Sequence, residues 1–171
     1  MKNYYTIRRE RKNARKSHKF TIFMGIFLLI LLVVSLYIVG ILFPIQKTKR
    51  QVSKAAFNQT NIVSIKNFKE SNRNGTYYSV RGTDNDKTSY IALFNSKKRL
   101  IKKVPANKRV SNSKLDSIYK KYKIRKVYSF DPSYYRKHIV FELSYKGKKN
   151  SLNYLTINFY NGKIYRSLKG I

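Results

Sequence analysis

Residues 20–43 have the sequence FTIFMGIFLLILLVVSLYIVGILF, which contains no charged side chain. As a helix rising about 1.5 Å per residue, this segment is about 36 Å long. The hydrocarbon core of a bilayer is about 30 Å thick, so the segment can cross it with some tilt. Its apolar residues surround the helix on all sides, whereas a helix at the edge of a soluble core keeps a polar face. We therefore predict a transmembrane helix over residues 20–43.

A cleaved signal peptide is the main alternative for this segment. The apolar region of a signal peptide is about 7–15 residues long and ends at a small-residue cleavage site. Here the run is longer and ends in Leu42-Phe43-Pro44-Ile45, and the chain has no cysteine that a lipoprotein cleavage motif would need. The sequence therefore favours an uncleaved anchor.

The charges on either side of the predicted span indicate its orientation. Residues 1–19 carry eight Lys and Arg against one acid, Glu10, whereas residues 44–54 carry four. The more basic flank of a span stays in the cytoplasm. We therefore expect a single-pass protein of the cell membrane, with residues 1–19 as a cytoplasmic tail and residues 44–171 outside.

The predicted exterior part is small and strongly basic. It has 128 residues with 30 Lys and Arg and six acids, a net charge of +24, and no cysteine. The absence of cysteine fits the exterior of a single-membrane bacterium, where disulfide staples are not in use. A basic surface of this kind attracts anions, and an exterior location excludes nucleic acid, which leaves anionic lipid headgroups and anionic wall polymers. Solubility in a saline or acidic habitat is the alternative explanation of the charge.

The hydrophobic period after the span changes from helical to alternating. Residues 44–60 keep apolar residues at helical spacing and predict a helix that continues from the span. From residue 62 onward, β-branched and aromatic residues alternate with polar ones between turn clusters, which predicts strands. A second helix is predicted over residues 113–122, with Ser113 as its N-cap. The predicted strands are residues 62–70, 76–83, 88–95, 99–104, 124–130, 138–146, 152–160 and 163–168.

The order of elements repeats: one helix and four strands occur twice, at an offset of about 64 residues. Residues 89–93 (SYIAL) align with residues 153–157 (NYLTI). A helix on a four-stranded antiparallel sheet is an α+β unit, so we predict units at residues 44–104 and 111–171, joined by a linker at 105–110. Units of this size supply only about 3–5 kcal/mol from their own cores. We therefore expect them to dock on each other and to form a groove of basic and tyrosine side chains near residues 102–110.

The residues that could support catalysis are few. The exterior part has six acids, one histidine (His138) and no cysteine, so it offers no metal-ligand spacing. Ser111 and Ser117 each precede a lysine by three residues, as in penicillin-recognising enzymes, but the other motifs of that mechanism are missing. Asp131 and Glu142 can meet across a hairpin, where an acid among many lysines is usually an ion-pair partner. We expect no enzymatic activity, no metal and no cofactor.

Tyrosines on the predicted strands are the candidate binding residues. Half of each alternating set must face the core, and the rest, interleaved with Lys and Arg, would form a protein- or sugar-binding face. The candidate partner-binding residues are Tyr128, Tyr145, Tyr154, Tyr160, Lys163 and Tyr165.

A basic tail, one span and two tandem helix-plus-four-strand units that end in residues 154–164 (YLTINFYNGKI) resemble the TseB-like (YpmB) family of Gram-positive bacteria. The resemblance implies cystatin-like domains related to PepSY modules. It also implies a non-enzymatic regulator of cell-wall elongation that binds a class B penicillin-binding protein or another membrane-anchored wall protein. The chain departs from the family at the second strand of the second unit, where Val140 and Phe141 stand in place of an expected tryptophan.

Two other functions stay open from the sequence. A PepSY-like module can restrain or modulate an exported peptidase. The basic surface can instead bind an anionic wall polymer directly. These hypotheses differ in their partner, because the first needs a protein and the second needs none.

Overall fold

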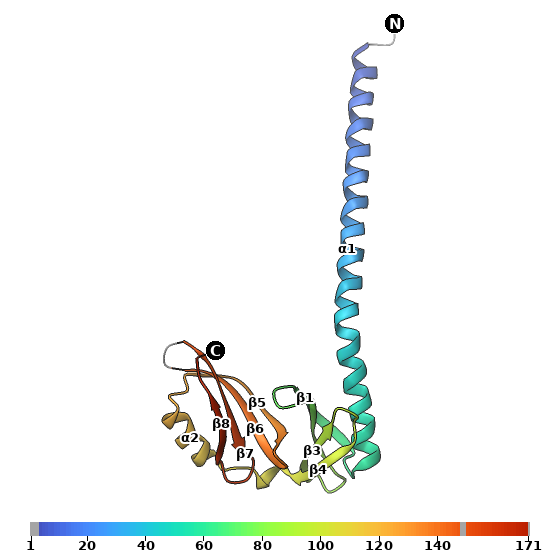
Figure 1. Cartoon of the computed structure of the whole chain (residues 1–171). Helices are drawn as coiled ribbons and strands as arrows, with labels where there is room; N and C mark the ends of the chain where they lie inside the picture. The colour runs from blue at the N-terminus through green and yellow to red at the C-terminus, as the bar shows by residue number, and fades with distance from the viewer. Residues whose placement is uncertain (1–3, 148–149, 171) are drawn as a thin grey trace. The chain divides into compact units, whose positions relative to one another are not determined.

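The computed structural model describes residues 4–147 and 150–170, with residues 4–19 described by their backbone alone (Figure 1). The chain divides into two compact parts, residues 1–47 and residues 48–171, which we call the N-terminal part and the C-terminal part. Helix α1, Tyr4–Gln59, begins in the N-terminal part, and its last residues belong to the C-terminal part.

The described residues of the N-terminal part are helical, and residues 20–43 among them are apolar. The side chains of residues 20–47 are all exposed, and α1 continues through Pro44. Among the described residues, α1 is the one helix that is long and apolar enough to cross a membrane. The length and the composition expected of the predicted span are therefore present in one continuous helix.

The first sheet of the C-terminal part is covered on one face by the end of α1. Its antiparallel strands lie in the order β1 (Ser64–Ser71), β2 (Tyr77–Thr83), β3 (Ser89–Asn95) and β4 (Leu100–Pro105). Val52 and Ala56 of α1 are fully buried against Val80, Ala92 and Phe94. The apolar residues at helical spacing on α1 and the alternating apolar residues of the strands thus pack in one cluster.

The second sheet has a helix of its own. After the short helix η1 (Ala106–Lys108) come α2 (Asn112–Lys121), β5 (Lys126–Tyr135), β6 (His138–Lys146), β7 (Leu152–Asn158) and β8 (Ile164–Leu168), with the strands antiparallel and in sequence order. Leu115 and Ile118 of α2 are buried in the core of this sheet. The predicted α+β class, with one helix and one four-stranded sheet repeated twice, is confirmed.

The N-cap prediction for the second helix was wrong. Ser111, not Ser113, has the extended backbone of an N-cap, and its hydroxyl accepts the Lys114 N–H at 3.3 Å. Ser113 already lies inside α2. The cap therefore falls two residues earlier than predicted. Ser111 stands three residues before Lys114, which is the spacing at which an N-cap hydroxyl reaches a free backbone N–H of the first turn.

Two strand ends also differ from prediction. Strand β5 continues to Tyr135 through Pro132, which pairs with Phe141. The strand tolerates a proline because β5 is the edge of its sheet, where a missing N–H breaks no ladder. Strand β7 ends at Asn158, whose side-chain oxygen accepts the Tyr160 and Asn161 N–H groups at 2.9 and 3.1 Å and so begins the turn early. Of the turn predicted at residues 147–150, residues 148–149 lie outside the described residues.

The two sheets share a core, as docking of the two units requires. On β3, Ala92 and Phe94 face the cluster under α1, whereas Ile91 and Leu93 belong to the cluster that contains Leu143 and Leu155 of the second sheet. Alternate residues of one strand therefore serve two different cores. The expected docking of the two units is confirmed.

Basic residues occupy turn positions that usually belong to glycine. Six described residues other than glycine have a positive φ, and five of them are Lys or Arg: Lys87, Lys98, Lys123, Arg136 and Lys137, with Asn150 as the sixth. Arg136 and Lys137 together form the β5–β6 turn, with φ values of 46° and 65°. A two-residue hairpin turn with both φ values positive favours Asn-Gly, so this turn is strained by its own side chains.

Candidate functional site: the seam between the two sheets

The seam is the region where strand β5 of the second sheet contacts β1, β2 and β3 of the first. The shared core lies on one face of the second sheet. On the opposite face, the strand register places Asp131, Glu142, Thr156 and Arg166 side by side across all four strands. Glu142 is only 4 % exposed and Thr156 is buried. The second sheet therefore has a polar face that is largely removed from water.

Glu142 is held by groups from the first sheet. One of its carboxylate oxygens accepts a hydrogen bond from the Ser71 hydroxyl, and the other accepts from the Asn74 side-chain amide at 2.5 Å. The side-chain oxygen of Asn74 in turn accepts a hydrogen bond from the Arg166 guanidinium at 3.4 Å. Because a buried carboxylate needs such donors, the β1–β2 connection fixes the first sheet onto the second.

Arg73 lies in the same connection and completes this polar cluster. Its guanidinium stacks over the Tyr154 ring at 4.0 Å from the ring centre. Burial lowers the pKa of Arg73 from its ordinary value, and the nearby Glu142 carboxylate opposes that effect. Within the described residues, its Nη1 atom is buried and has no hydrogen-bond partner. The nearby Glu142 carboxylate and the tyrosine ring therefore both stabilise this partly buried cation.

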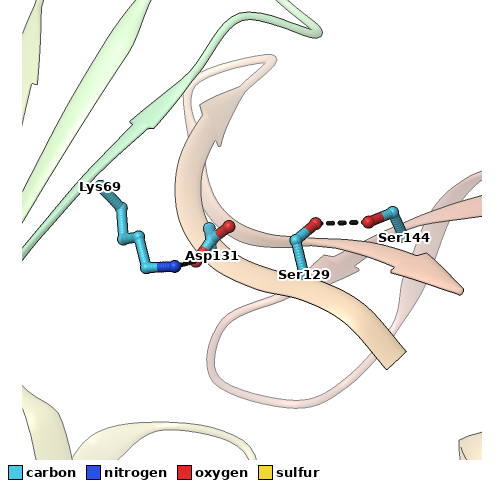
Figure 2. Close-up of polar contacts among 4 residues, drawn as sticks. All are labelled: Lys69, Ser129, Asp131 and Ser144. Atoms are coloured by element: carbon cyan, nitrogen blue, oxygen red, sulfur yellow. Dashed lines mark hydrogen bonds and ion pairs between the residues drawn. The ribbon is translucent and has the colours of Figure 1, made fainter. Parts of the chain in front are cut away.

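A second polar contact crosses the seam closer to the surface. Figure 2 shows Lys69 reaching from β1 to Asp131 on β5, where the lysine nitrogen and a carboxylate oxygen are 3.2 Å apart. Beside it, the hydroxyls of Ser129 and Ser144 lie 2.5 Å apart and link β5 to β6. The ion pair between an acid and a surrounding lysine was expected for Asp131, whereas Glu142 instead binds neutral donors.

A pocket of about 370 Å³ opens at the seam. Both sheets and the linker contribute to its lining, which includes the basic residues Lys69, Arg81 and Arg109 and the apolar residues Ile91 and Phe130. Val127 and Tyr128 line it as well, and Tyr128 is 53 % exposed. A pocket is thus present where the two units meet, but it matches the predicted groove of basic and tyrosine side chains only in part. Of residues 102–110 only Ala106 and Arg109 line it, Tyr128 is the one tyrosine among its lining residues, and the lining includes the acid Asp131.

The structure does not bring the six candidate binding residues together. Tyr128 is the one that lines the seam pocket. Tyr160 is 45 % exposed in the turn after β7, and Lys163 is exposed beyond the same turn. Of these three candidates, Tyr128 therefore lies at the seam, whereas Tyr160 and Lys163 lie together at the β7–β8 turn.

The other three tyrosines are used by the fold. Tyr154 lies beneath Arg73, and the Tyr165 hydroxyl accepts from the Asn158 amide at 2.8 Å. Tyr145 is only 1 % exposed, because it shares the core face of β6 with Leu143, so this candidate presents no surface to a partner. The alternating pattern of residues 138–146 predicts a strand. It does not predict which of the two sides of β6 faces the core.

Buried tyrosines predict an alkaline limit to stability. Burial raises the pKa of Tyr78, Tyr119 and Tyr145 above the ordinary value of 10. A group whose folded-state pKa is raised gives stability that is complete below its unfolded pKa and is lost as pH rises through the folded value. We expect the full-length protein in detergent micelles to lose stability above about pH 10.

Tyrosinate absorbance and circular dichroism, followed together during an alkaline titration, check this expectation. A late fraction of the tyrosines should ionise only as the fold is lost. Tyr145→Phe should reduce that late fraction. Ionisation of all tyrosines in one step near pH 10, with the fold intact, would contradict the expectation.

Within residues 20–147 and 150–170, whose side chains the structure describes, no three His, Cys, Asp or Glu side chains approach closely enough to hold a metal ion. The acids of the seam instead contact Ser71, Asn74 and Lys69. The chemistry of the seam is therefore that of binding groups: cations, amides, hydroxyls and an exposed tyrosine.

Comparison with solved structures finds a similar fold in the YpmB protein from Bacillus subtilis. The two structures superpose with a TM-score of 0.60 and 19% sequence identity, over 69% of this chain and 94% of that chain. The sequence matches no protein-family model and no curated protein. At this identity the likeness concerns the fold, and it confirms the fold resemblance inferred from the order of elements.

Proposed function

We propose that this chain, which shares its fold with the YpmB protein, is a membrane-anchored, non-enzymatic regulator of cell-wall elongation that binds a class B penicillin-binding protein. Residues 1–19 lie in the cytoplasm, residues 20–43 span the cell membrane, and the domain lies outside. Residues 44–104 and 111–171 are two cystatin-like units joined by residues 105–110. The fold likeness and the long apolar helix support this proposal.

The observation that carries the proposal is the seam pocket. Its walls come from two sheets that share a core and are also joined by the hydrogen bonds of the buried Glu142 carboxylate. Tyrosine and arginine dominate the binding energy of protein interfaces. Tyr128, with Arg81 and Arg109 beside it, offers this combination to a protein surface.

The way the acids are used supports a binding role over an enzymatic one. A general acid or base must reach a substrate. Glu142 is buried and receives hydrogen bonds from Ser71 and Asn74, and Asp131 is paired with Lys69. Both acids thus stabilise the contact between the sheets.

A photo-crosslinking amino acid at position 128 of the full-length protein, expressed in its own cells, tests the proposal. We expect a crosslinked product that contains a class B penicillin-binding protein, identified by mass spectrometry. The matched control is the same probe at position 160, an exposed tyrosine outside the seam pocket, which should not give this product.

Other outcomes would contradict the proposal in different ways. Capture of an exported peptidase at position 128 would favour the PepSY-like hypothesis. Equal capture of the synthase at positions 128 and 160 would remove the seam as the docking surface. In a binding assay with the purified synthase, Tyr128→Ala should weaken affinity about 30-fold, as expected of a central tyrosine.

A further inference from the structure

Two pockets on the second unit adjoin each other away from the seam. The first, of about 400 Å³, lies between α2 and the β7–β8 turn, and the second, of about 480 Å³, lies between the end of α2, Gly147, Ser151 and residues 169–170. Lys121 and Tyr122 line both. The two pockets are therefore neighbours along one surface, which we call the lysine track.

The lysine track is defined by five lysines. Lys114 and Lys163 line the first pocket, Lys123 and Lys169 line the second, and Lys121 lines both. All five are exposed, and no Asp or Glu is among the described residues that line either pocket. Within the described part of the chain, the one ion pair is Lys69 with Asp131, so none of the five has an ion-pair partner. Five positive charges thus converge on two concave sites without compensation.

In the first pocket, the β7–β8 turn contacts α2 directly. Gly162 has a φ of 73°, and a Cβ built there would be 3.0 Å from side-chain carbons of Lys114 and Val110. Only a glycine allows this close approach of the turn to α2. Lys163, the residue after Gly162, therefore lines the same pocket as Lys114 and Lys121 of α2.

In the second pocket, a hydrogen bond attaches the end of the chain to β7. The Gly170 N–H donates to the Asn153 side-chain oxygen at 3.0 Å, which holds Lys169 beside β7. The Lys169 nitrogen lies 5.9 Å from the centre of the Tyr122 ring. Lys123 has a φ of 51°, a conformation that disfavours every residue with a Cβ. A lysine is thus held where the backbone would favour glycine.

We propose that the lysine track binds a linear phosphodiester polymer of the polyol-phosphate type, with successive phosphates in the two pockets and the intervening polyol beside Tyr122. A chain with regularly repeated single charges matches two adjacent basic pockets that share one lysine and one aromatic ring. The inference rests on the exterior location in the proposed function, but it does not involve the seam.

The surface fits a polymer better than a bilayer. Basic surfaces that bind membranes usually add apolar side chains that enter the interface. The large exposed apolar residues described in the C-terminal part are Phe57, Val63, Val127, Tyr128 and Tyr160, and none of them lines either pocket of the lysine track. Concave pockets also suit a chain that can enter them, whereas a headgroup layer is broad and flat.

The test uses the full-length protein in neutral detergent micelles and poly(glycerol phosphate) as the probe, with binding measured by calorimetry. The variant Lys121→Gln/Lys163→Gln/Lys169→Gln should bind at least about tenfold more weakly, because it removes three phosphate-neutralising charges. The matched control Lys66→Gln/Lys97→Gln/Lys102→Gln removes three exposed charges from the first unit and should change affinity by less than about threefold. Replacing Lys121, Lys163 and Lys169 by Arg should retain binding, which separates lost charge from lost folding.

Two results would overturn the proposal. Equal losses in the two Gln variants would mean that the general positive field binds the polymer, without a site. Stronger binding to phosphatidylglycerol vesicles than to the polymer, weakened by the same three substitutions, would assign the track to a membrane surface. Tyr128→Ala should leave polymer affinity unchanged, so failure of the lysine track and failure of the seam are distinguished by which variant responds.

Discussion

Phe141→Ala is expected to lower the free energy of unfolding of the C-terminal part by about 3–5 kcal/mol, the usual loss for a large aromatic side chain removed from a core. Phe141 is 3 % exposed and stacks on Phe130 and on Phe159, with ring centres 4.2 and 5.0 Å apart. It belongs to the cluster that also contains Ile91 and Leu93 of the first sheet. The cavity would therefore weaken both sheets, which should unfold in one transition.

Urea unfolding of the full-length protein in micelles, followed by circular dichroism and by tyrosine fluorescence, measures this loss. The two signals should coincide in the parent and in the variant, since the sheets share their core. Phe57→Ala is the control, because Phe57 is 46 % exposed, and it should shift stability by less than about 1 kcal/mol. Two separate transitions, of which Phe141→Ala shifts only one, would show that the sheets are independent.

Glu142→Ala is expected to destabilise the protein by a similar amount, about 3–5 kcal/mol, through a different mechanism. The substitution removes the acceptor of the Ser71 and Asn74 hydrogen bonds and takes the nearby negative charge away from the partly buried Arg73 guanidinium. Unpaired buried donors and an uncompensated charge both oppose folding. The loss therefore arises from the groups that remain more than from the one removed.

A double-mutant cycle distinguishes this mechanism from simple loss of packing. Arg73→Met in the Glu142→Ala background should recover part of the lost stability, because the partly buried charge that Glu142 compensates is then removed as well. Glu70→Ala is the matched control: Glu70 is an exposed acid on β1, bonded to Asn72, and its removal should have little effect. Strictly additive losses at positions 73 and 142 in urea unfolding would contradict the coupling.

The order of the elements could be predicted because it depends on local patterns. Alternation along residues such as Ile139, Phe141 and Leu143 is visible in the sequence and needs only a core on one side. The docking of the two units followed from their small size, and the position of the groove followed from the linker. These inferences use only chain length and hydrophobic period, which can be read from the sequence without knowing the fold.

The polar cluster of the seam could not be predicted, because its burial depends on distant residues. Glu142 contacts Ser71 and Asn74, about seventy residues earlier in the chain. Nothing in the local sequence of β6 distinguishes this buried acid from an exposed one. The helical spacing of Lys114 and Lys121, seven residues apart, did contain a signal for the lysine track, because that interval places both on one face of α2.

The left-handed turns have a consequence for how this sequence evolves. Lys87, Lys98, Lys123, Arg136 and Lys137 each occupy a conformation that destabilises a residue with a Cβ by about 1 kcal/mol relative to glycine. Five such positions together amount to about 5 kcal/mol, which is as much as the whole stability of many small domains. Selection for stability alone would replace these residues by glycine or asparagine. Replacing any one of these five residues by glycine is therefore expected to make the domain more stable and to remove one positive charge at the same time.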